Sequence, residues 1–182
     1  MAKQDLLSVT TVRKLLDYNP ETGKFVWRPR PKEMFKSERG MMSWNSRLAG
    51  KAAFTNVGGH GYLVGYIFNK CRLAHRLAYA HHFGHWPKQN IDHINGDTTD
   101  NRIANLRDVS TQENLKNQKM PSHNTSGVCG VYWNKPTQKW LASISINGKN
   151  KHIGLFGDIE EAKAARKAAE IQYGYHPNHG RS

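Results

Sequence analysis

The sequence predicts an α+β protein built from two parts, and three observations lead to this prediction. A segment that reads strand, loop, strand and helix begins at Gln89 and runs past Thr111. Three short strand-like segments and one Ala-rich helix follow over residues 130–173. A polar run between them is typical of a connector. We therefore expect a first domain at 1–120 with its core motif at 71–119, a linker at 121–127 and a second domain at 128–182.

The first domain begins with alternating helix and strand signals. A helix is expected over Thr10–Asp17 and a strand over Lys24–Trp27, with turn residues between them. Residues 28–51 hold seven basic and two acidic side chains, and we expect them to form an irregular loop or arm. This arm either follows a phosphate backbone or is mobile. A hairpin over 61–73 and an amphipathic helix over 74–83 complete the β-rich extension.

Local signals also place elements in the second half of the chain. Ser110 followed by Glu113 forms the pattern of a capping box, which predicts a helix beginning at Thr111. Strands are expected near 130–133, 140–146 and 149–156. The last two are joined by Asn147-Gly148, a strong hairpin signal. The helix over 159–173 carries small Ala residues that allow close packing on the resulting three-stranded antiparallel sheet.

The charge balance points to nucleic acid. The chain has 27 Lys and Arg against 14 Asp and Glu, a formal net charge of +13, and the excess is spread along its length. Such a distribution favours a long contact track over a basic tail. The alternative is that the charge serves solubility alone.

Other classes of protein find little support. The two cysteines, Cys71 and Cys129, form no C-x-x-C pair, so a zinc ribbon is disfavoured and reduced thiols are expected. No apolar run is long enough for a membrane span, and no secretion signal is visible. We expect a cytoplasmic protein, in the host cell if a phage encodes it, with no membrane and no protein partner.

Residues 92–114 carry the chemistry. Hydrolysis of a phosphodiester needs a base for water and a cation for the phosphate, held in register. His93 titrates near neutrality and suits the base. Asp92 and Asn114 offer oxygen ligands suited to Mg²⁺ or Mn²⁺. Asn105 can tie loop backbone groups with its amide. Because neighbours on a strand point to opposite faces, Asp92 and His93 converge only if the strand is distorted or ends there.

This segment resembles the HNH endonucleases of phages and mobile introns. The matching residues are His93, Asn105 and Asn114 within the runs 91–97, 100–106 and 113–114, and the likeness extends over roughly residues 10–120. The resemblance implies a ββα-metal fold with one divalent cation, Mg²⁺ or Mn²⁺. It implies His93 as general base, Asp92 with Asn114 as metal ligands and Asn105 as the structural asparagine. Products would carry 5′-phosphate and 3′-hydroxyl ends.

Several residues around this motif keep two interpretations. His75 is either an accessory donor or part of the helix–hairpin core, and the structural reading is favoured. Asn117 is a reserve metal ligand. Arg76 and Arg102 are candidate phosphate clamps that contact DNA.

Residues 124–175 resemble the Apetala-type (plant ethylene-response-factor-like) DNA-binding domain, which carries a three-stranded sheet into the major groove. The likeness rests on residues 130–133, 139–144, 153–156 and 160–162. Carried over by position, it implies that six residues face DNA: Tyr132, Asn134, Trp140, Ser143, Ser145 and His152. Four lysines are candidates for phosphate contacts, which position the protein without specifying sequence: Lys135, Lys139, Lys149 and Lys151.

Together these features predict a metal-dependent DNA endonuclease of the homing type. Its second domain is expected to bind double-stranded DNA and so direct the cleavage. The alternative is a sequence-specific DNA-binding protein with a silent nuclease core, against which the intact Asp92, His93 and Asn114 argue. An RNA-directed nuclease is a third reading, disfavoured by the likeness of the sheet to duplex readers.

Overall fold

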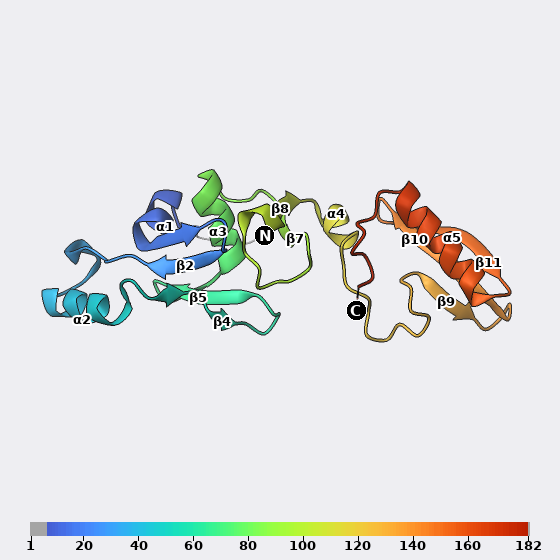
Figure 1. The fold of residues 1–182 in the computed structure, drawn as a ribbon, viewed down its shortest axis with the longest axis horizontal. Coiled ribbons are helices and arrows are strands. Elements are labelled where there is room, and N and C mark those ends of the chain that lie inside the picture. The colour runs from blue at the N-terminus through green and yellow to red at the C-terminus, as the bar shows by residue number, and fades with distance from the viewer. Residues whose placement is uncertain (1–6, 182) are drawn as a thin grey trace. The chain divides into compact units, whose positions relative to one another are not determined.

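The computed structural model describes residues 7–181, which form two compact units divided between Asp108 and Val109. Figure 1 shows both units, with elements labelled where there is room. The expected linker at 121–127 therefore lies inside the second unit. The reason is local, because the chain around Lys116–Met120 is hydrogen-bonded to the C-terminal tail. Backbone bonds join His176 to Lys116, Gly180 to Gln118 and Met120 to Arg181.

Over the residues that the structure describes, the first unit consists of short strands and three α-helices. In chain order its elements are α1 (Val9–Leu15), β1 (Leu16–Asn19), β2 (Lys24–Trp27), the 3-10 turn η1 (Lys32–Met34), α2 (Glu38–Leu48), β3 (Ala52–Ala53), β4 (Asn56–Val57), β5 (Leu63–Ile67), β6 (Lys70–Leu73), α3 (Ala74–Phe83), β7 (Asn90–His93), η2 (Ile103–Asn105) and β8 (Leu106–Val109). The sheets have the orders β1-β2-β3, β4-β5-β6 and β7-β8. The pairs β1–β2, β2–β3, β4–β5 and β5–β6 are antiparallel.

The core of the first unit lies between its helices and the two three-stranded sheets. Val12 and Leu15 of α1 and Leu77 of α3 are fully buried together with Ile67 of β5. The Ser8 hydroxyl caps α1 by accepting from the Thr11 amide. This core fixes α3 and the β5–β6 hairpin, the elements that back the candidate site.

One expectation for the first unit was wrong. Residues 28–51 were predicted to be irregular, whereas α2 spans Glu38–Leu48. Its N-cap is Ser37, whose hydroxyl accepts from the Gly40 amide. The residues that face the core, Met41, Trp44, Asn45 and Leu48, recur at helical spacing. The polar Asn45 interrupts the apolar pattern, so the sequence gives only a weak helix signal here.

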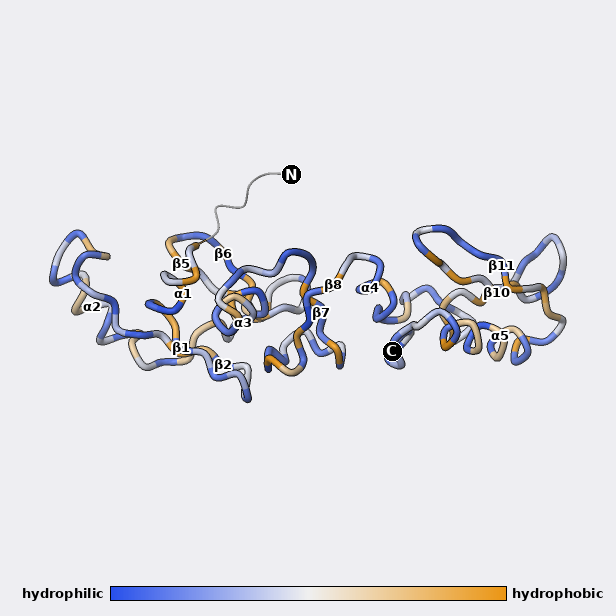
Figure 2. Tube along the Cα trace, turned by 90° about the horizontal axis from the view of Figure 1, so that it is seen from above, coloured by the Kyte–Doolittle hydropathy of each residue, from blue (hydrophilic) through white to orange (hydrophobic). Residues whose placement is uncertain are grey.

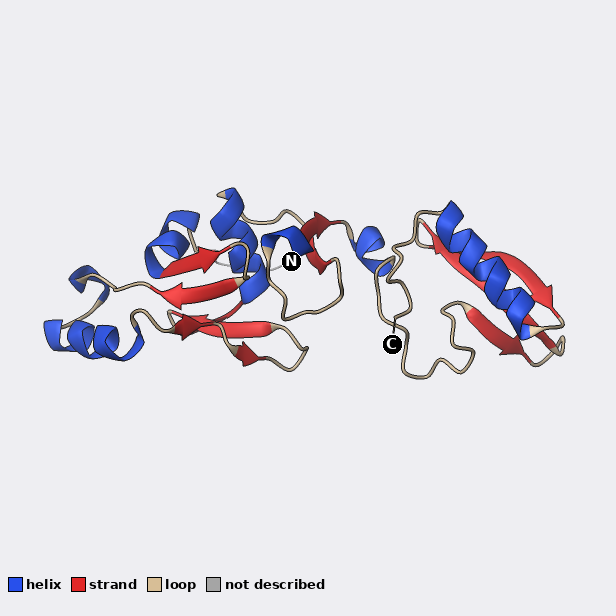
Figure 3. Ribbon diagram, viewed as in Figure 1, coloured by secondary structure: helices blue, strands red, loops and turns tan. Residues whose placement is uncertain are grey.

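The second unit is one helix on one sheet, preceded by a short helix. Its elements are α4 (Thr111–Leu115), β9 (Val131–Asn134), β10 (Lys139–Ile146), β11 (Lys149–Phe156) and α5 (Ile159–Gln172). The antiparallel sheet has the order β11-β10-β9. Figure 3 shows α5 lying across this sheet, and Val131, Ala142 and Ala162 form the buried centre between them. The expected strands, hairpin and helix of this region are confirmed within a residue or two.

The remaining general expectations concern thiols and membranes. Both cysteines are free, Cys71 exposed and Cys129 partly buried, which agrees with the expected reduced state. Within residues 7–181, no helix is long and apolar enough to cross a membrane.

Candidate active site

The two central residues of the motif stand at the end of β7 and point to different partners. The Asp92 carboxylate accepts two hydrogen bonds from the Arg107 guanidinium of β8, at 2.8 Å from Nε and 2.6 Å from Nη2. His93 instead reaches Asn101 in the loop between the strands. This difference follows from the alternation of side chains along a strand. β7 ends at His93, where the Gly96 amide closes a turn on the His93 carbonyl.

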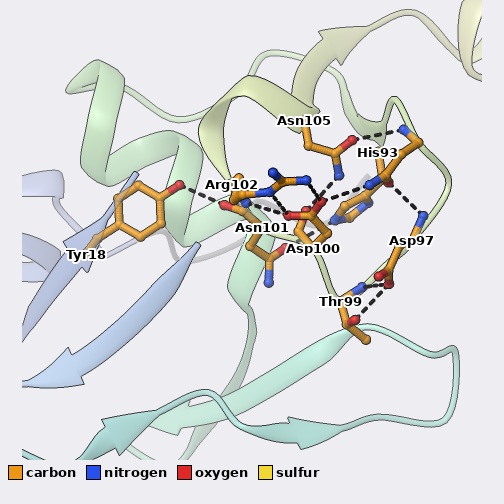
Figure 4. Close-up of polar contacts among 9 residues, drawn as sticks. Tyr18, His93, Asp97, Thr99, Asp100, Asn101, Arg102 and Asn105 are labelled. Atoms are coloured by element: carbon orange, nitrogen blue, oxygen red, sulfur yellow. Dashed lines mark hydrogen bonds and ion pairs between the residues drawn. The ribbon is translucent and has the colours of Figure 1, made fainter. Parts of the chain in front are cut away.

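The ring of His93 is held by a buried amide, as Figure 4 shows. The Nε2 atom of His93 lies 3.1 Å from Oδ1 of Asn101, whose side chain is almost completely buried. An amide oxygen only accepts, so we assign the imidazole proton to Nε2. The basic lone pair of the neutral ring is then on Nδ1, the atom that general-base chemistry would use.

Burial keeps this imidazole neutral. Desolvation lowers the pKa of His93, while the Asn101 hydrogen bond and nearby Asp92 partly offset that effect. The neighbouring ring of His75 lies edge-on to His93 at a centroid distance of 5.2 Å and contacts Tyr62. Burial, with smaller contributions from His93 and Arg76, lowers the pKa of His75 to about 3. His75 is therefore uncharged at neutral pH and packs beside His93.

Asn105 organises the loop that follows His93. Its Oδ1 accepts from the Asn95 amide at 2.9 Å, and its Nδ2 donates to the Asp100 carbonyl at 2.8 Å. Its backbone carbonyl accepts from the Ile94 amide. The loop is closed further by Asp97, whose carboxylate accepts from the amide and hydroxyl of Thr99. Asn105 therefore holds both ends of the loop that carries the partner of His93.

Asn101 is the site residue that the sequence reasoning missed. The Tyr18 hydroxyl donates to its carbonyl at 2.7 Å, which secures the loop to the β1–β2 hairpin. That hairpin approaches so closely that a Cβ on Gly23 would lie 2.5 Å from the backbone of Asn101 and Arg102. Burial and the charge of Asp100 raise the pKa of Tyr18, so the phenol stays a donor. Asn101 lies in a run that resembles the HNH family, but no local pattern predicts that its side chain meets His93.

Arg107 was missed as well. It lies on β8 beside Asp92, and only the pairing of β7 with β8 brings the two together. The Asp92 side chain is 8% exposed and that of Arg107 34%. Removing the arginine would leave a buried carboxylate without this partner, which is costly.

The two expected metal ligands have side chains of the type that a hard divalent cation prefers. Asp92 supplies a carboxylate and Asn114 an amide oxygen, the ligand types that Mg²⁺ and Mn²⁺ prefer. Within the described range 7–181, no group of three or more His, Cys, Asp or Glu side chains is arranged to hold a metal.

Asn114 lies on α4, in the second unit. The helix has only five residues but carries a complete capping box, in which Ser110 and Glu113 exchange side-chain and backbone hydrogen bonds. The reserve ligand Asn117 is fully buried, and Nη1 of Arg181 donates to its carbonyl and to its Oδ1. The Asn117 amide is thus engaged in holding the C-terminal tail.

The two candidate phosphate clamps of the first unit have partners within the protein. Arg102 makes a bidentate ion pair with Asp100, at 2.8 Å and 2.6 Å. This pair lowers the pKa of Asp100 to about 2. Arg76 donates to the carbonyl of Gln89 at 3.1 Å. Both guanidiniums therefore brace the β7–β8 region.

The register of the second-unit sheet divides its candidate residues between two faces. Tyr132 pairs with Leu141, and Ser143 pairs with His152, so these side chains share one face. Alternation along the strands extends this face. It comprises Tyr132, Asn134, Lys139, Ser143, Ser145 and His152.

The other three candidates lie on the helix-covered side. Trp140 packs against the core cluster and stacks edge-on with Trp133 at 5.3 Å. Lys151 donates to the Tyr173 hydroxyl at 2.8 Å, and Lys149 pairs with Ile146 across the hairpin. Six of the nine expected residues in this sheet therefore form one continuous surface.

Comparison with known proteins finds a likeness in the segment that carries the motif. A family model described as HNH endonuclease matches residues 72–116, the range that holds Asp92, His93, Asn105 and Asn114. The chain is similar to "Protein 3.8" of Escherichia phage T7, with 39% identity over 63 residues. The match covers 35% of this chain and about half of that relative, 52%. No solved structure matches. The likeness to HNH endonucleases is therefore carried by residues 72–116, less than half of the chain.

Proposed function

We propose that the protein is a metal-dependent DNA endonuclease that hydrolyses phosphodiester bonds with His93 as general base. The observation that carries the proposal is the buried pair of His93 and Asn101, which fixes the imidazole tautomer inside the segment that matches the family. A neutral, oriented imidazole is the group needed to accept a proton from water. The strong positive charge of the chain suits a DNA substrate.

The roles of the site residues follow from their chemistry. Nδ1 of His93 takes the proton of the attacking water, and Asn101 retains the proton on Nε2 throughout. Asp92 and Asn114 would hold the divalent cation, and Arg107 fixes the orientation of the Asp92 carboxylate. When bound, the cation neutralises developing charge on the phosphate and the leaving oxygen.

Plasmid nicking tests the reaction class. Supercoiled DNA is incubated with the protein and Mg²⁺ or Mn²⁺, with and without a chelator. We expect nicking that the chelator abolishes and that Asp92→Ala reduces by about 100-fold or more. Nicking that continues in the chelator would contradict the metal-dependent mechanism, and binding without any nicking would favour the silent-core alternative.

We further propose that the sheet of the second unit selects the site of cleavage, as an Apetala-type module of a homing-type enzyme would. The proposal is supported by the single face that Tyr132, Ser143 and His152 share and by the helix α5 that backs the opposite side. A sheet of this kind can read base edges in the major groove, while Lys139 contacts phosphate.

Sequencing of cleavage ends tests this selection. A random-target library is cut by the wild type and by Tyr132→Ala/His152→Ala. We expect the wild type to show site preference and the double variant to lose it. An unchanged pattern would show that this face is not the reader.

A further inference from the structure

The basic arm, residues 28–51, carries an ordered helix whose purpose the active site leaves unexplained. It holds seven basic and two acidic residues. Its helix α2 buries none of its residues completely, yet it is attached to the unit in a defined way. The helix itself carries two arginines, Arg39 and Arg47, and one acidic residue, Glu38. A helix with so little burial in so basic an arm needs another reason for its position.

One face of α2 attaches it to the core. Met41, Trp44, Asn45 and Leu48 follow the spacing of a helical stripe, and each is partly shielded from solvent. Trp44 and Leu48 pack against the core cluster, and Trp44 meets Trp27 edge-on at 5.7 Å. Asn45 exchanges two hydrogen bonds with the backbone of Arg30, at 2.8 Å and 2.9 Å.

Arg30 reinforces this attachment. Its guanidinium carbon lies 3.9 Å from the ring centroid of Trp44 and 5.1 Å from that of Trp27. Burial lowers the pKa of Arg30, and the stacked rings supply the attraction that offsets its desolvation. Arg30 is thus used within the protein, and the helix it holds is fixed in orientation.

The opposite face of α2 is basic and exposed. It comprises Arg39, Met42, Ser43, Ser46 and Arg47, all exposed, with Met42 at 62%. Among residues 7–181, neither Arg39 nor Arg47 makes an ion pair, and the same holds for exposed Lys36 just before the helix. The nearest acidic residue of the helix, Glu38, pairs with Lys32 at 3.6 Å. The small serines between the arginines leave room for a backbone to approach.

This face lies far from the motif within the first unit. Figures 1 and 2 both show α2 at one end of the unit and β7, which carries His93, at the other. A group at this position meets a duplex away from the scissile phosphate. Its charge complements the phosphate backbone of such a duplex.

We propose that the outward face of α2, together with Lys36, binds the phosphate backbone of duplex DNA that flanks the cleavage site. The inference rests on the proposed function for the identity of the duplex as substrate. Phosphate contacts of this kind position the protein and contribute to affinity without selecting sequence.

Salt-dependent binding tests the proposal independently of cleavage. Affinity for a labelled duplex of mixed sequence is measured between about 50 and 200 mM salt, in full-length protein that carries His93→Ala so that no DNA is cut. We expect Arg39→Ala/Arg47→Ala to reduce the slope of log K against log salt by about two, since each lost phosphate contact removes close to one unit. The loss should be the same for duplexes of different sequence.

The matched control is Lys14→Ala/Lys88→Ala, which removes the same charge from exposed positions of the same unit outside the arm. This control should leave the slope nearly unchanged, and circular dichroism should show both variants folded. An unchanged slope in the arm variant, or an equal loss in the control, would overturn the inference. The two proposals can also fail separately. If the arm variant reduces the salt slope but the wild-type protein does not nick DNA, the arm contact is supported and only the nuclease proposal is refuted.

Discussion

The hydrogen bond between His93 and Asn101 is the detail at the residue scale on which the chemistry depends. It joins a residue that the sequence predicts as the base to one for which the sequence predicts no role. His93, Asp92 and Asn105 could be predicted because their residue types suit the reaction. Asn101 and Arg107 could not, because their roles arise from a loop and a strand pairing that bring distant backbone together.

Substituting Asn101 tests its role in orienting His93. Asn101→Ala removes the oxygen that accepts the hydrogen bond from Nε2 of His93, so the ring can turn and exchange tautomers. We expect kcat to fall by about 100-fold with KM nearly unchanged, as for a small misplacement of a catalytic group. Asn101→Asp keeps an acceptor and should recover most of kcat. Equal losses in both variants would indicate that the amide serves folding alone.

The ion pair between Asp100 and Arg102 makes stability depend on pH. The folded-state pKa of Asp100 is lowered to about 2, so the carboxylate contributes stability above its ordinary pKa and loses it as pH falls from about 4 towards 2. Asp100→Asn should be less stable than wild type at pH 7, and the difference should shrink over that interval. Thermal unfolding at several pH values measures this, and a constant difference would argue against the ion pair as its source.

At the scale of elements, strong local patterns in the sequence were sufficient to predict several helices and strands. The capping box of α4, the Asn147-Gly148 hairpin and the helix α3 were all predicted near their observed bounds. The helix α2 was missed because its inward face mixes aromatic, apolar and amide side chains. What attaches it is Arg30 stacked on Trp44, a contact that no local window contains.

The capping box of α4 gives the prediction at this scale. Ser110→Ala should cost about 1 kcal/mol, the typical value of an N-cap, and should fray a helix of only five residues. Because α4 carries Asn114, we expect nicking by the variant to need a higher Mg²⁺ concentration.

Ser37→Ala provides the control for that experiment. It removes the equivalent cap of α2 and should lower stability by a similar amount. Half-maximal nicking at saturating DNA should then occur at the wild-type Mg²⁺ concentration. If both variants shift the metal requirement equally, the effect reflects general destabilisation.

At the scale of the whole molecule, the division of the chain was the least predictable feature. A polar run at 121–127 indicated a linker, but residues beside it are bonded to a tail more than fifty positions away. Lys116 donates to the Tyr173 carbonyl at 2.7 Å, and Arg181 donates to the Asn117 carbonyl. Such long-range bonds place α4 in the second unit, and composition alone carries no sign of them.

Deleting residues 122–182 tests the consequence. The deletion removes the partners of Lys116, Asn117 and Gln118, so the end of α4 loses its support. We expect the truncated protein to lose metal-dependent nicking as well as DNA affinity, even at protein concentrations that saturate the DNA. Full nicking under those conditions would show that the helix holds without the tail.

The most direct test of the account is the single-turnover rate of DNA cleavage at saturating protein, comparing wild type with His93→Ala. The account predicts a loss of about 100- to 10,000-fold, the range expected when a general base is removed. His60→Ala, which changes an exposed histidine of the same unit, should cleave at the wild-type rate. Equal rates for wild type and His93→Ala would contradict the assignment of His93 as the base and, with it, the mechanism proposed for this site.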